Sequence, residues 1–266
     1  MKTLSIANQK GGCGKTTTAI NLSAALAHFE KRVLLVDLDP QGHASLGTGI
    51  DPNEADLTVY EALVGEADSL TEVIQSTTTK GLDVAPSNIL LSGFDVDVIH
   101  RAGREYLLRN ALAAVRDRYD YCLIDSSPSL TLLTLNGLTA ADELVIPVQT
   151  HYYAMEGLKQ LMDSVSLAKS RFNEKLKILG LVLTLYEKGT KLSRDVQEQM
   201  RGFFGDLVFK SVIHRNVRLA EAPSAGEPIL TYAPKSRGAL DYMALAWEIL
   251  HNEAQIRTPE ENLVHI

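Results

Sequence analysis

Short apolar runs alternate with longer amphipathic stretches along most of the chain. Five runs are continuous in apolar residues, as interior strands of a parallel sheet are, and they cover residues 3–8, 32–37, 121–125, 143–148 and 178–184. The amphipathic stretches have helical spacing and cover residues 15–29, 104–119, 154–172, 193–204 and 239–251. This alternation predicts an α/β fold, in which helices cover both faces of a mostly parallel, twisted sheet.

Residues 40–100 are the least regular part of the chain and are rich in Gly, Thr and Asp. No low-complexity linker or internal repeat divides the sequence, so we expect one domain over residues 1–252 and a polar tail over residues 253–266. The tail carries acids and Pro259, a composition typical of solvated chain rather than of a membrane-binding amphipathic helix.

The composition is typical of a soluble globular protein, with 45% hydrophobic residues in a chain of 266. No apolar run reaches the roughly 18 residues of a membrane span, and the first strand begins so early that we expect no signal peptide. Two cysteines, Cys13 and Cys122, do not make a disulfide framework, so we expect a cytoplasmic protein. A formal net charge of −7 argues against a wholly basic nucleic-acid binder but leaves room for a local basic patch.

A glycine-rich segment follows the first predicted strand and reads Lys10-Gly11-Gly12-Cys13-Gly14-Lys15-Thr16-Thr17. Small residues let successive backbone N–H groups turn inward around phosphates, and the following helix points its N-terminal dipole at the same anion. In such a loop Lys15 reaches the β- and γ-phosphates of a nucleotide, while the Thr16 hydroxyl ligates Mg²⁺. Gln9 stands where the usual pattern has glycine, and Lys10 adds a second lysine. The segment therefore predicts a nucleotide site of an unusual kind.

Carboxylates follow two further strands, at the edge where open α/β sheets bind ligands. Asp37 and Asp39 close the second predicted strand, and Asp125 closes the third. Asp125 fits the carboxylate that holds Mg²⁺ in phosphate-loop proteins, usually through a coordinated water. Asp37 and Asp39 lie two residues apart and share one face of an extended segment, so one can orient the attacking water and the other can support the metal. An aspartate at a strand end often only caps a turn, but the three motifs in this order favour a functional site.

These segments together resemble the deviant phosphate loop and the following motifs of the ParA/MinD ATPases. The resemblance rests on residues 10–17, 33–42, 123–130, 145–149 and 215–224, and it spans about residues 2–250. It is nearest to the short, Soj-like ParA proteins of chromosome and plasmid partition. Cys13 stands where the family usually has valine, and Ser127 where it often has a second proline. Cys13 contributes its backbone N–H, so nucleotide binding survives, although a thiol of lowered pKa at a helix N-terminus would be open to oxidation.

The resemblance implies ATP and Mg²⁺ as cofactors and a homodimer that closes around ATP. Lys10 matches the family's signature lysine, which reaches the partner's phosphates and acts with Lys15 and Asp39 in catalysis. Asp39 matches the carboxylate linked to water activation, and it joins Thr16 and Asp125 in the implied Mg²⁺ set. The implied nucleotide contacts are Lys10, Gly11, Gly12, Cys13, Gly14, Lys15, Thr16, Thr17, His214 and Asn216, the last two near the adenine.

Positive charge gathers late in this acidic chain. With nine Lys or Arg and six Asp or Glu, residues 186–237 carry +3, which leaves −10 elsewhere. Such asymmetry suits a face that contacts phosphates, although a cluster of this size is usually only a solvated surface. Arg218 matches a family position linked to nonspecific DNA binding, whereas another such position is Gly189 here. The residues expected to contact DNA are Lys188, Lys191, Arg194, Arg215 and Arg218.

The resemblance implies a cytoplasmic, Mg²⁺-dependent partition ATPase that associates with the nucleoid when it holds ATP. The ATP-bound dimer would bind DNA nonspecifically, and hydrolysis stimulated by a ParB-like partner would release it, so that a chromosome or plasmid is segregated. The alternatives are a ParA-like positioner of a protein cargo such as a carboxysome or chemoreceptor cluster, a MinD-like membrane regulator, and a metabolic ATPase of the same fold. The polar tail disfavours the membrane regulator, and a cluster-carrying reductase would need paired cysteines at the dimer face.

Overall fold

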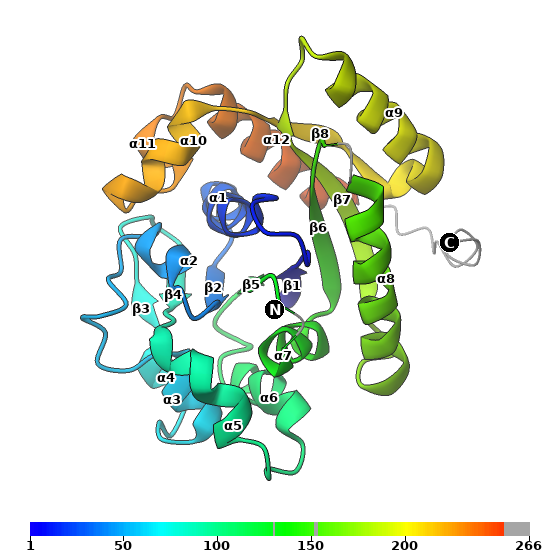
Figure 1. The fold of residues 1–266 in the computed structure, drawn as a ribbon. Helices are drawn as coiled ribbons and strands as arrows, with labels where there is room; N and C mark the ends of the chain where they lie inside the picture. The colour runs from blue at the N-terminus through cyan, green and yellow to red at the C-terminus, as the bar shows by residue number, and fades with distance from the viewer. Residues whose placement is uncertain (130, 152–153, 253–266) are drawn as a thin grey trace.

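A central sheet of eight strands runs through the protein in the order β3-β4-β2-β5-β1-β6-β7-β8 (Figure 1). The computed structural model describes residues 1–129, 131–151 and 154–252. Neighbouring strands pair in parallel, except that β3 is antiparallel to β4. The strands are β1 Lys2–Ile6, β2 Val33–Leu38, β3 Gln75–Ser76, β4 Leu82–Ala85, β5 Tyr121–Ser126, β6 Glu143–Gln149, β7 Lys177–Tyr186 and β8 Val208–His214. The predicted α/β fold with a mostly parallel sheet is confirmed.

Helices cover both faces of this sheet. The α-helices are α1 Lys15–His28, α2 His43–Leu46, α3 Val59–Val64, α4 Leu70–Val73, α5 Phe94–Asp97, α6 Leu107–Ala113, α7 Leu132–Ala140, α8 Ala154–Arg171, α9 Lys191–Phe204, α10 Val217–Glu221, α11 Ile229–Tyr232 and α12 Arg237–Asn252. Short 3-10 helices are η1 Ile89–Gly93, η2 Arg104–Tyr106, η3 Gly205–Leu207 and η4 Ala222–Ala225. Figure 1 shows α1 and α12 on one side of the sheet and α6, α7 and α8 on the other.

The alternation of side chains along the inner strands fills a core on each face. Val33 and Leu35 of β2 join the core beneath α1 and α12, whereas Leu34 and Val36 join the core beneath α3 and α6. Because both faces are buried, the inner strands must be apolar throughout, and that is why the sequence predicted β1, β2, β5, β6 and β7.

The outer strands and one inner helix were missed. Lys210 and Ser211 interrupt the apolar pattern of β8, which ends the sheet on one side, and β4 lies in the irregular part of the sequence. Most residues of α7 are buried, so the helix lacks the polar face that makes a helix visible in a sequence.

The helix predicted over residues 104–119 is shorter than expected. It consists of η2 and α6 and ends at Ala113. Beyond that point the N–H groups of Ala114, Val115 and Arg118 bond to carbonyls three residues back, as in tight turns. These turns place Tyr119 where its hydroxyl donates to Asp83 Oδ2 at 2.8 Å.

The predicted polar tail, residues 253–266, lies outside the described residues. Within the described ranges, no helix is both long enough and apolar enough to cross a membrane.

Candidate nucleotide site and basic surface

The loop between β1 and α1 has the backbone geometry of a phosphate cradle. Gly12 and Gly14 have φ values of +71° and +87°, in the left-handed region that glycine adopts without strain. Gly14 is the N-cap of α1 and provides no side-chain cap, so the first N–H groups of the helix are available to an anion. Gly11 and Gly12 are exposed, and a Cβ at either position would meet no atom within 4 Å. The loop backbone is therefore open to a ligand.

Lys15, the predicted phosphate-binding lysine, is only 7% exposed. Its Nζ donates to the Lys10 carbonyl at 3.0 Å, which holds the ammonium against the loop. When a nucleotide binds, the ammonium can leave the Lys10 carbonyl and bind a phosphate oxygen instead. The structure contains one subunit, so the action of Lys10 across a dimer stays a prediction.

Two residues that the sequence analysis missed hold the loop in place. Asn8 accepts from Lys10 N at 3.0 Å and donates to the Pro147 carbonyl at 2.7 Å. Thr184, at the carboxyl end of β7, donates through Oγ1 to the Cys13 carbonyl at 2.7 Å. No local pattern identifies Thr184, because it lies 171 residues from its partner.

The unusual Gln9 has a structural role as well. Its Nε2 donates to Ser164 Oγ on α8 at 2.7 Å. A glycine at this position would lack that bond, so Gln9 ties the start of the loop to the helix layer.

Cys13 is fully buried, and burial raises the pKa of its thiol. A raised pKa leaves less thiolate at neutral pH, so the alternative of a reactive, low-pKa Cys13 is wrong for this structure. Cys13 therefore contributes to the loop through its backbone and not through its thiol.

The two strand-end aspartates lie directly opposite one another. Asp37 of β2 pairs in register with Asp125 of β5, and both are fully buried. Both carboxylate oxygens of Asp37 are hydrogen-bonded: they accept from Ser45 N and Ser45 Oγ, both at 2.8 Å, and from Asp39 N at 3.1 Å. Burial raises the pKa of Asp37 to about 6. Asp37 therefore fixes the segment that carries Asp39 and does not point a spare oxygen at a metal.

Asp125 is the opposite case. Neither of its carboxylate oxygens has a hydrogen-bond partner among the described residues. Burial, and then the negative charge of Asp37, hold its pKa well above the usual range, while the nearby Thr16 hydroxyl and Lys15 oppose that shift. An unpartnered buried carboxylate beside a phosphate loop fits a divalent cation, which would supply the missing partner. Thr16 and Asp125 are thus the residues that would hold Mg²⁺.

Asp39 is half-buried at the start of the next segment. Its Oδ1 accepts from Gln41 N at 3.0 Å, and its main-chain carbonyl accepts from Ser87 Oγ at 2.5 Å. One side-chain oxygen is held and the other forms no hydrogen bond with the described residues, as a group that positions water requires. Its roles toward water and metal stay predictions.

The two residues expected near the adenine are engaged elsewhere in the described structure. Asn216 caps α10 by accepting from Arg218 N at 2.9 Å. The His214 ring contacts Asp241 Oδ2 through Nδ1 at 2.9 Å and packs edge-on against Tyr186. Contact of either residue with adenine stays a prediction.

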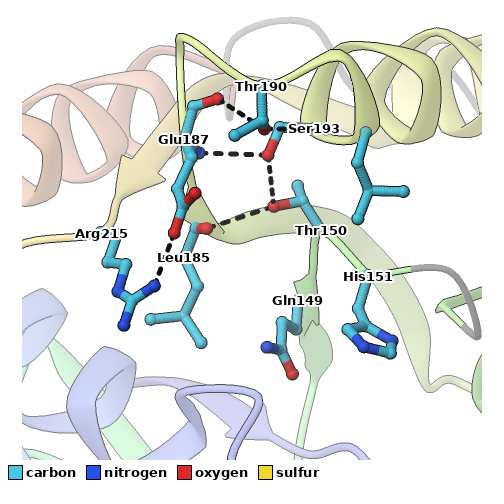
Figure 2. A pocket seen from close by; sticks show the side chains of 9 residues that line it. Gln149, Thr150, His151, Leu185, Glu187, Thr190, Ser193 and Arg215 are labelled. Atoms are coloured by element: carbon cyan, nitrogen blue, oxygen red, sulfur yellow. Dashed lines mark hydrogen bonds and ion pairs between the residues drawn. The ribbon is translucent and has the colours of Figure 1, made fainter.

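A pocket of about 420 Å³ opens at the carboxyl ends of β6 and β7 (Figure 2). Arg215 projects into it and pairs through Nη1 with Glu187 Oε1 at 2.7 Å. The other lining residues are Gln149, Thr150, His151, Leu185, Thr190, Leu192 and Ser193.

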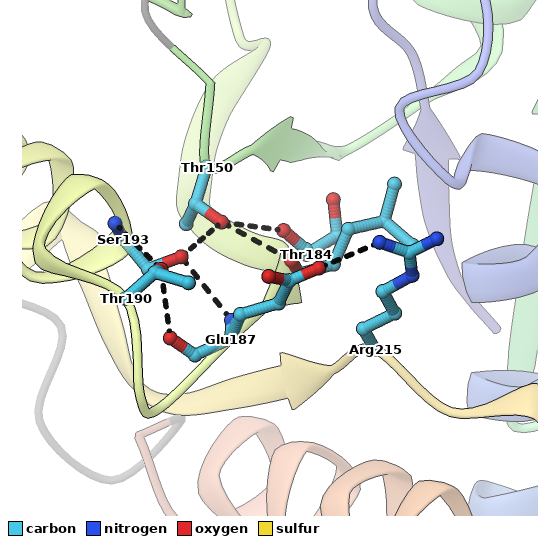
Figure 3. A network of polar contacts seen from close by, with 7 residues as sticks. Thr150, Thr184, Glu187, Thr190, Ser193 and Arg215 are labelled. Carbon is cyan, nitrogen blue, oxygen red and sulfur yellow. Dashed lines mark hydrogen bonds and ion pairs between the residues drawn. The ribbon is translucent and has the colours of Figure 1, made fainter.

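A polar network lies behind this pocket (Figure 3). Thr150 Oγ1 donates to the Leu185 carbonyl at 3.2 Å and contacts Ser193 Oγ at 3.3 Å, while Ser193 Oγ accepts from Glu187 N at 3.2 Å. Leu185 has a φ of +52°, an uncommon conformation for a side chain with a Cβ. Thr184, the residue before Leu185, also holds the glycine-rich loop. The segment from Thr184 to Ser193 therefore connects that loop to the start of α9.

All five residues expected to contact DNA are exposed. Arg215 pairs with Glu187, and Arg218 pairs with Glu221 at 2.9 Å. Exposed pairs of this kind contribute little free energy and exchange readily for a phosphate. Lys188, together with Lys191 and Arg194 at the start of α9, makes no ion pair with any described residue.

Known proteins resemble the chain over nearly its whole length. A family model described as an AAA domain matches residues 1–178. The sporulation initiation inhibitor protein Soj of Bacillus subtilis is 50% identical over 251 residues, covering 94% of this chain and 99% of that protein. The chromosome partitioning protein ParA of Caulobacter vibrioides is 46% identical over 255 residues, covering 95% of each. The crystal structure of cobyrinic acid a,c-diamide synthase from Mycobacterium smegmatis with bound ADP and magnesium superposes with a TM-score of 0.85 at 37% identity, covering 97% of each chain.

Proposed function

Since the chain belongs to the ParA/MinD family of P-loop ATPases, we propose that it is a partition ATPase whose ATP-bound dimer binds DNA nonspecifically. The relatives named Soj and ParA support partition as the process. The observation that carries the nucleotide chemistry is the buried, unpartnered Asp125 beside an open glycine-rich loop.

The chain's own residues divide the work of ATP hydrolysis. The loop N–H groups and Lys15 bind the phosphates, and Thr16 and Asp125 would hold Mg²⁺. Bound Mg²⁺ would neutralise the negative charge that develops on the phosphates in the transition state. Asp39 positions the attacking water, while Asp37 keeps the Asp39 segment in place through its bonds to Ser45.

Lys10 makes ATP a switch for assembly in this proposal. A cation delivered by the partner subunit neutralises the transferred phosphoryl group, so one ATP both joins the subunits and completes the site. Hydrolysis, stimulated by a ParB-like partner, removes that contact and releases the protein from DNA. The free energy by which ATP favours the dimer sets the population bound to DNA.

DNA co-sedimentation with ATP, with ADP and without nucleotide tests the proposal. We expect sedimentation only with ATP, loss of ATP binding in Lys15→Ala, and loss of DNA binding at retained ATP binding in Arg218→Glu. Arg109→Glu, an equally exposed change on α6, is the matched control and is expected to sediment normally.

A metabolic ATPase is the rival of another class, and the structural likeness to a diamide synthase is the observation in its favour. It predicts ATP binding with no nucleotide-dependent sedimentation. Equal sedimentation in all three nucleotide states would contradict the switch, and normal ATP affinity in Lys15→Ala would contradict the nucleotide site.

A further inference from the structure

A second pocket, of about 410 Å³, lies over β8, away from the glycine-rich loop. Lys210, Val212 and His214 alternate along β8 and so project to one face of the sheet. Figure 1 shows α9 and α12 on either side of this strand. The lining residues are Tyr186, Lys188, Gln197, Lys210, Val212, His214 and Arg237.

Among the described residues, three cations and no acid line this pocket. Lys188 and Lys210 are exposed, and neither forms an ion pair within the described part of the chain. A single unpaired lysine is usually a solvated surface residue. Here Lys188 follows β7, Lys210 lies on β8 and Arg237 begins α12, so the fold brings three distant positive charges to one concave space.

Arg237 is held in a defined orientation. Its Nε lies 2.9 Å from Asp241 Oδ1, although the side chain is 61% exposed. Its terminal nitrogens have no hydrogen bond to any described residue. A guanidinium fixed through Nε presents its remaining donors as a planar fork, the geometry that binds phosphate oxygens in pairs.

Two acids of α12 that bond to this strand, Asp241 and Glu248, are already engaged. Asp241 also accepts from His214 N at 2.9 Å. Glu248 accepts from Lys210 N at 2.7 Å and from Ser211 N at 2.8 Å. Because both carboxylates are buried and hold backbone N–H groups of β8, they do not cancel the lysines that face the pocket.

We propose that this pocket is a second phosphate-binding site, separate from the nucleotide loop, and that the phosphate belongs to the backbone of DNA. Lys188 is shared with the basic surface described above, so the pocket extends that surface with Lys210 and Arg237. The identity of the ligand rests on the proposed function, whereas the phosphate chemistry rests on the pocket alone. A small phosphate anion offers the same oxygens, and the test separates the two sources.

The DNA arm measures the affinity of the full chain for duplex DNA with a nonhydrolysable ATP analogue, as a function of salt. Removing one lysine–phosphate contact makes the plot of log K against log salt less steep by about 0.9. If the two proteins bind equally at 1 M salt, the variant binds DNA about eightfold more weakly at 0.1 M salt. We expect this for Lys210→Gln at every DNA sequence. Arg237→Lys, which keeps the charge but not the fork, is expected to weaken binding as well. Lys80→Gln, an exposed change before β4 at the other end of the sheet, is the matched control.

The phosphate arm uses the Lys15→Ala chain, so that the glycine-rich loop does not compete. Inorganic pyrophosphate is titrated while the backbone amide signals of Lys210 and His214 are followed by NMR. If these shifts disappear in Lys15→Ala/Lys210→Gln, the pocket binds phosphate. If Lys210→Gln also leaves the DNA affinity unchanged, the ligand of the pocket is a free phosphate rather than DNA.

The proposal is overturned if Lys210→Gln changes neither DNA affinity nor the pyrophosphate shifts. If the wild-type chain binds no DNA with ATP, the proposed function fails. The pyrophosphate titration alone then shows whether the pocket binds phosphate.

Discussion

Replacing Thr184 with valine tests whether a residue far from the glycine-rich loop in sequence maintains the nucleotide site. Thr184 is 2% exposed, and its Oγ1 donates to the Cys13 carbonyl at 2.7 Å. Its methyl group lies 3.7 Å from an ideal Cβ at Gly14, so the side chain also packs on the loop. Valine keeps this shape and removes only the donor.

An unsatisfied buried carbonyl costs about 1–3 kcal/mol. In the nucleotide-free protein the loop can relax and turn the Cys13 carbonyl towards water, and ATP must then restore the original loop. The loss is therefore shared between the free energy of unfolding and the free energy of ATP binding, with a sum of about 1–3 kcal/mol. If the whole loss appeared in the free energy of ATP binding, the ATP affinity would fall about 5- to 150-fold, since about 1.4 kcal/mol corresponds to a tenfold change.

Urea unfolding of the nucleotide-free Thr184→Val protein, together with titration of a fluorescent ATP analogue, measures the two parts. Thr184→Ser keeps the hydroxyl and is the control. It is expected to lose about 1 kcal/mol of stability from the missing methyl group and to keep its ATP affinity. If the two losses in Thr184→Val sum to less than about 0.3 kcal/mol, the bond to Cys13 does not support the loop and the reasoning fails.

Three further changes test other parts of the structure. Asp125→Asn removes a buried carboxyl whose oxygens have no hydrogen bond within the described residues, so the free energy of unfolding of the nucleotide-free protein at pH 8 should rise by about 1 kcal/mol while Mg²⁺-dependent ATP binding is lost; a fall in stability would contradict the desolvated carboxyl. Gly180→Ala places a Cβ 2.7 Å from the Phe209 ring and 2.9 Å from the Leu207 carbonyl oxygen and should cost about 1–3 kcal/mol in urea unfolding with ATP affinity unchanged, and an unchanged urea midpoint would show that ring and backbone both yield without cost. The hydrogen bond from Arg32 lowers the pKa of Asp120 to about 2, below its unfolded value of about 3.9, so this pair stabilises the fold above pH 4 and the stabilisation is lost as the pH falls towards 2. Arg32→Gln should therefore lower the urea midpoint slightly at neutral pH and not at pH 2, and a difference that persisted at pH 2 would assign it to something other than this charge.

Strands and helices were predicted correctly where their burial leaves a regular pattern in the sequence. β1, β2, β5, β6 and β7 are apolar because both faces of the inner sheet are covered, and α1 follows the loop as expected. The pattern failed for β8, whose polar residues face solvent and pocket, and for α7, which is buried almost all round. A strand is visible in the sequence when its apolar run is unbroken, and a helix when it has one apolar and one polar face. β8 has an interrupted apolar run and α7 has no polar face, so neither was detected.

The sequence by itself determined the glycine-rich loop and the aspartates at the ends of two strands, because each of these depends on residues adjacent in the chain. Tertiary structure decided which aspartate keeps a free carboxylate, since Asp37 bonds to Ser45 whereas Asp125 forms no hydrogen bond that meets normal geometry within the described residues. It also joined Thr184 to Cys13 across 171 residues and brought Lys188, Lys210 and Arg237 to one pocket. Strand order and register fix such contacts, and these depend on the packing of the whole sheet rather than on any local spacing.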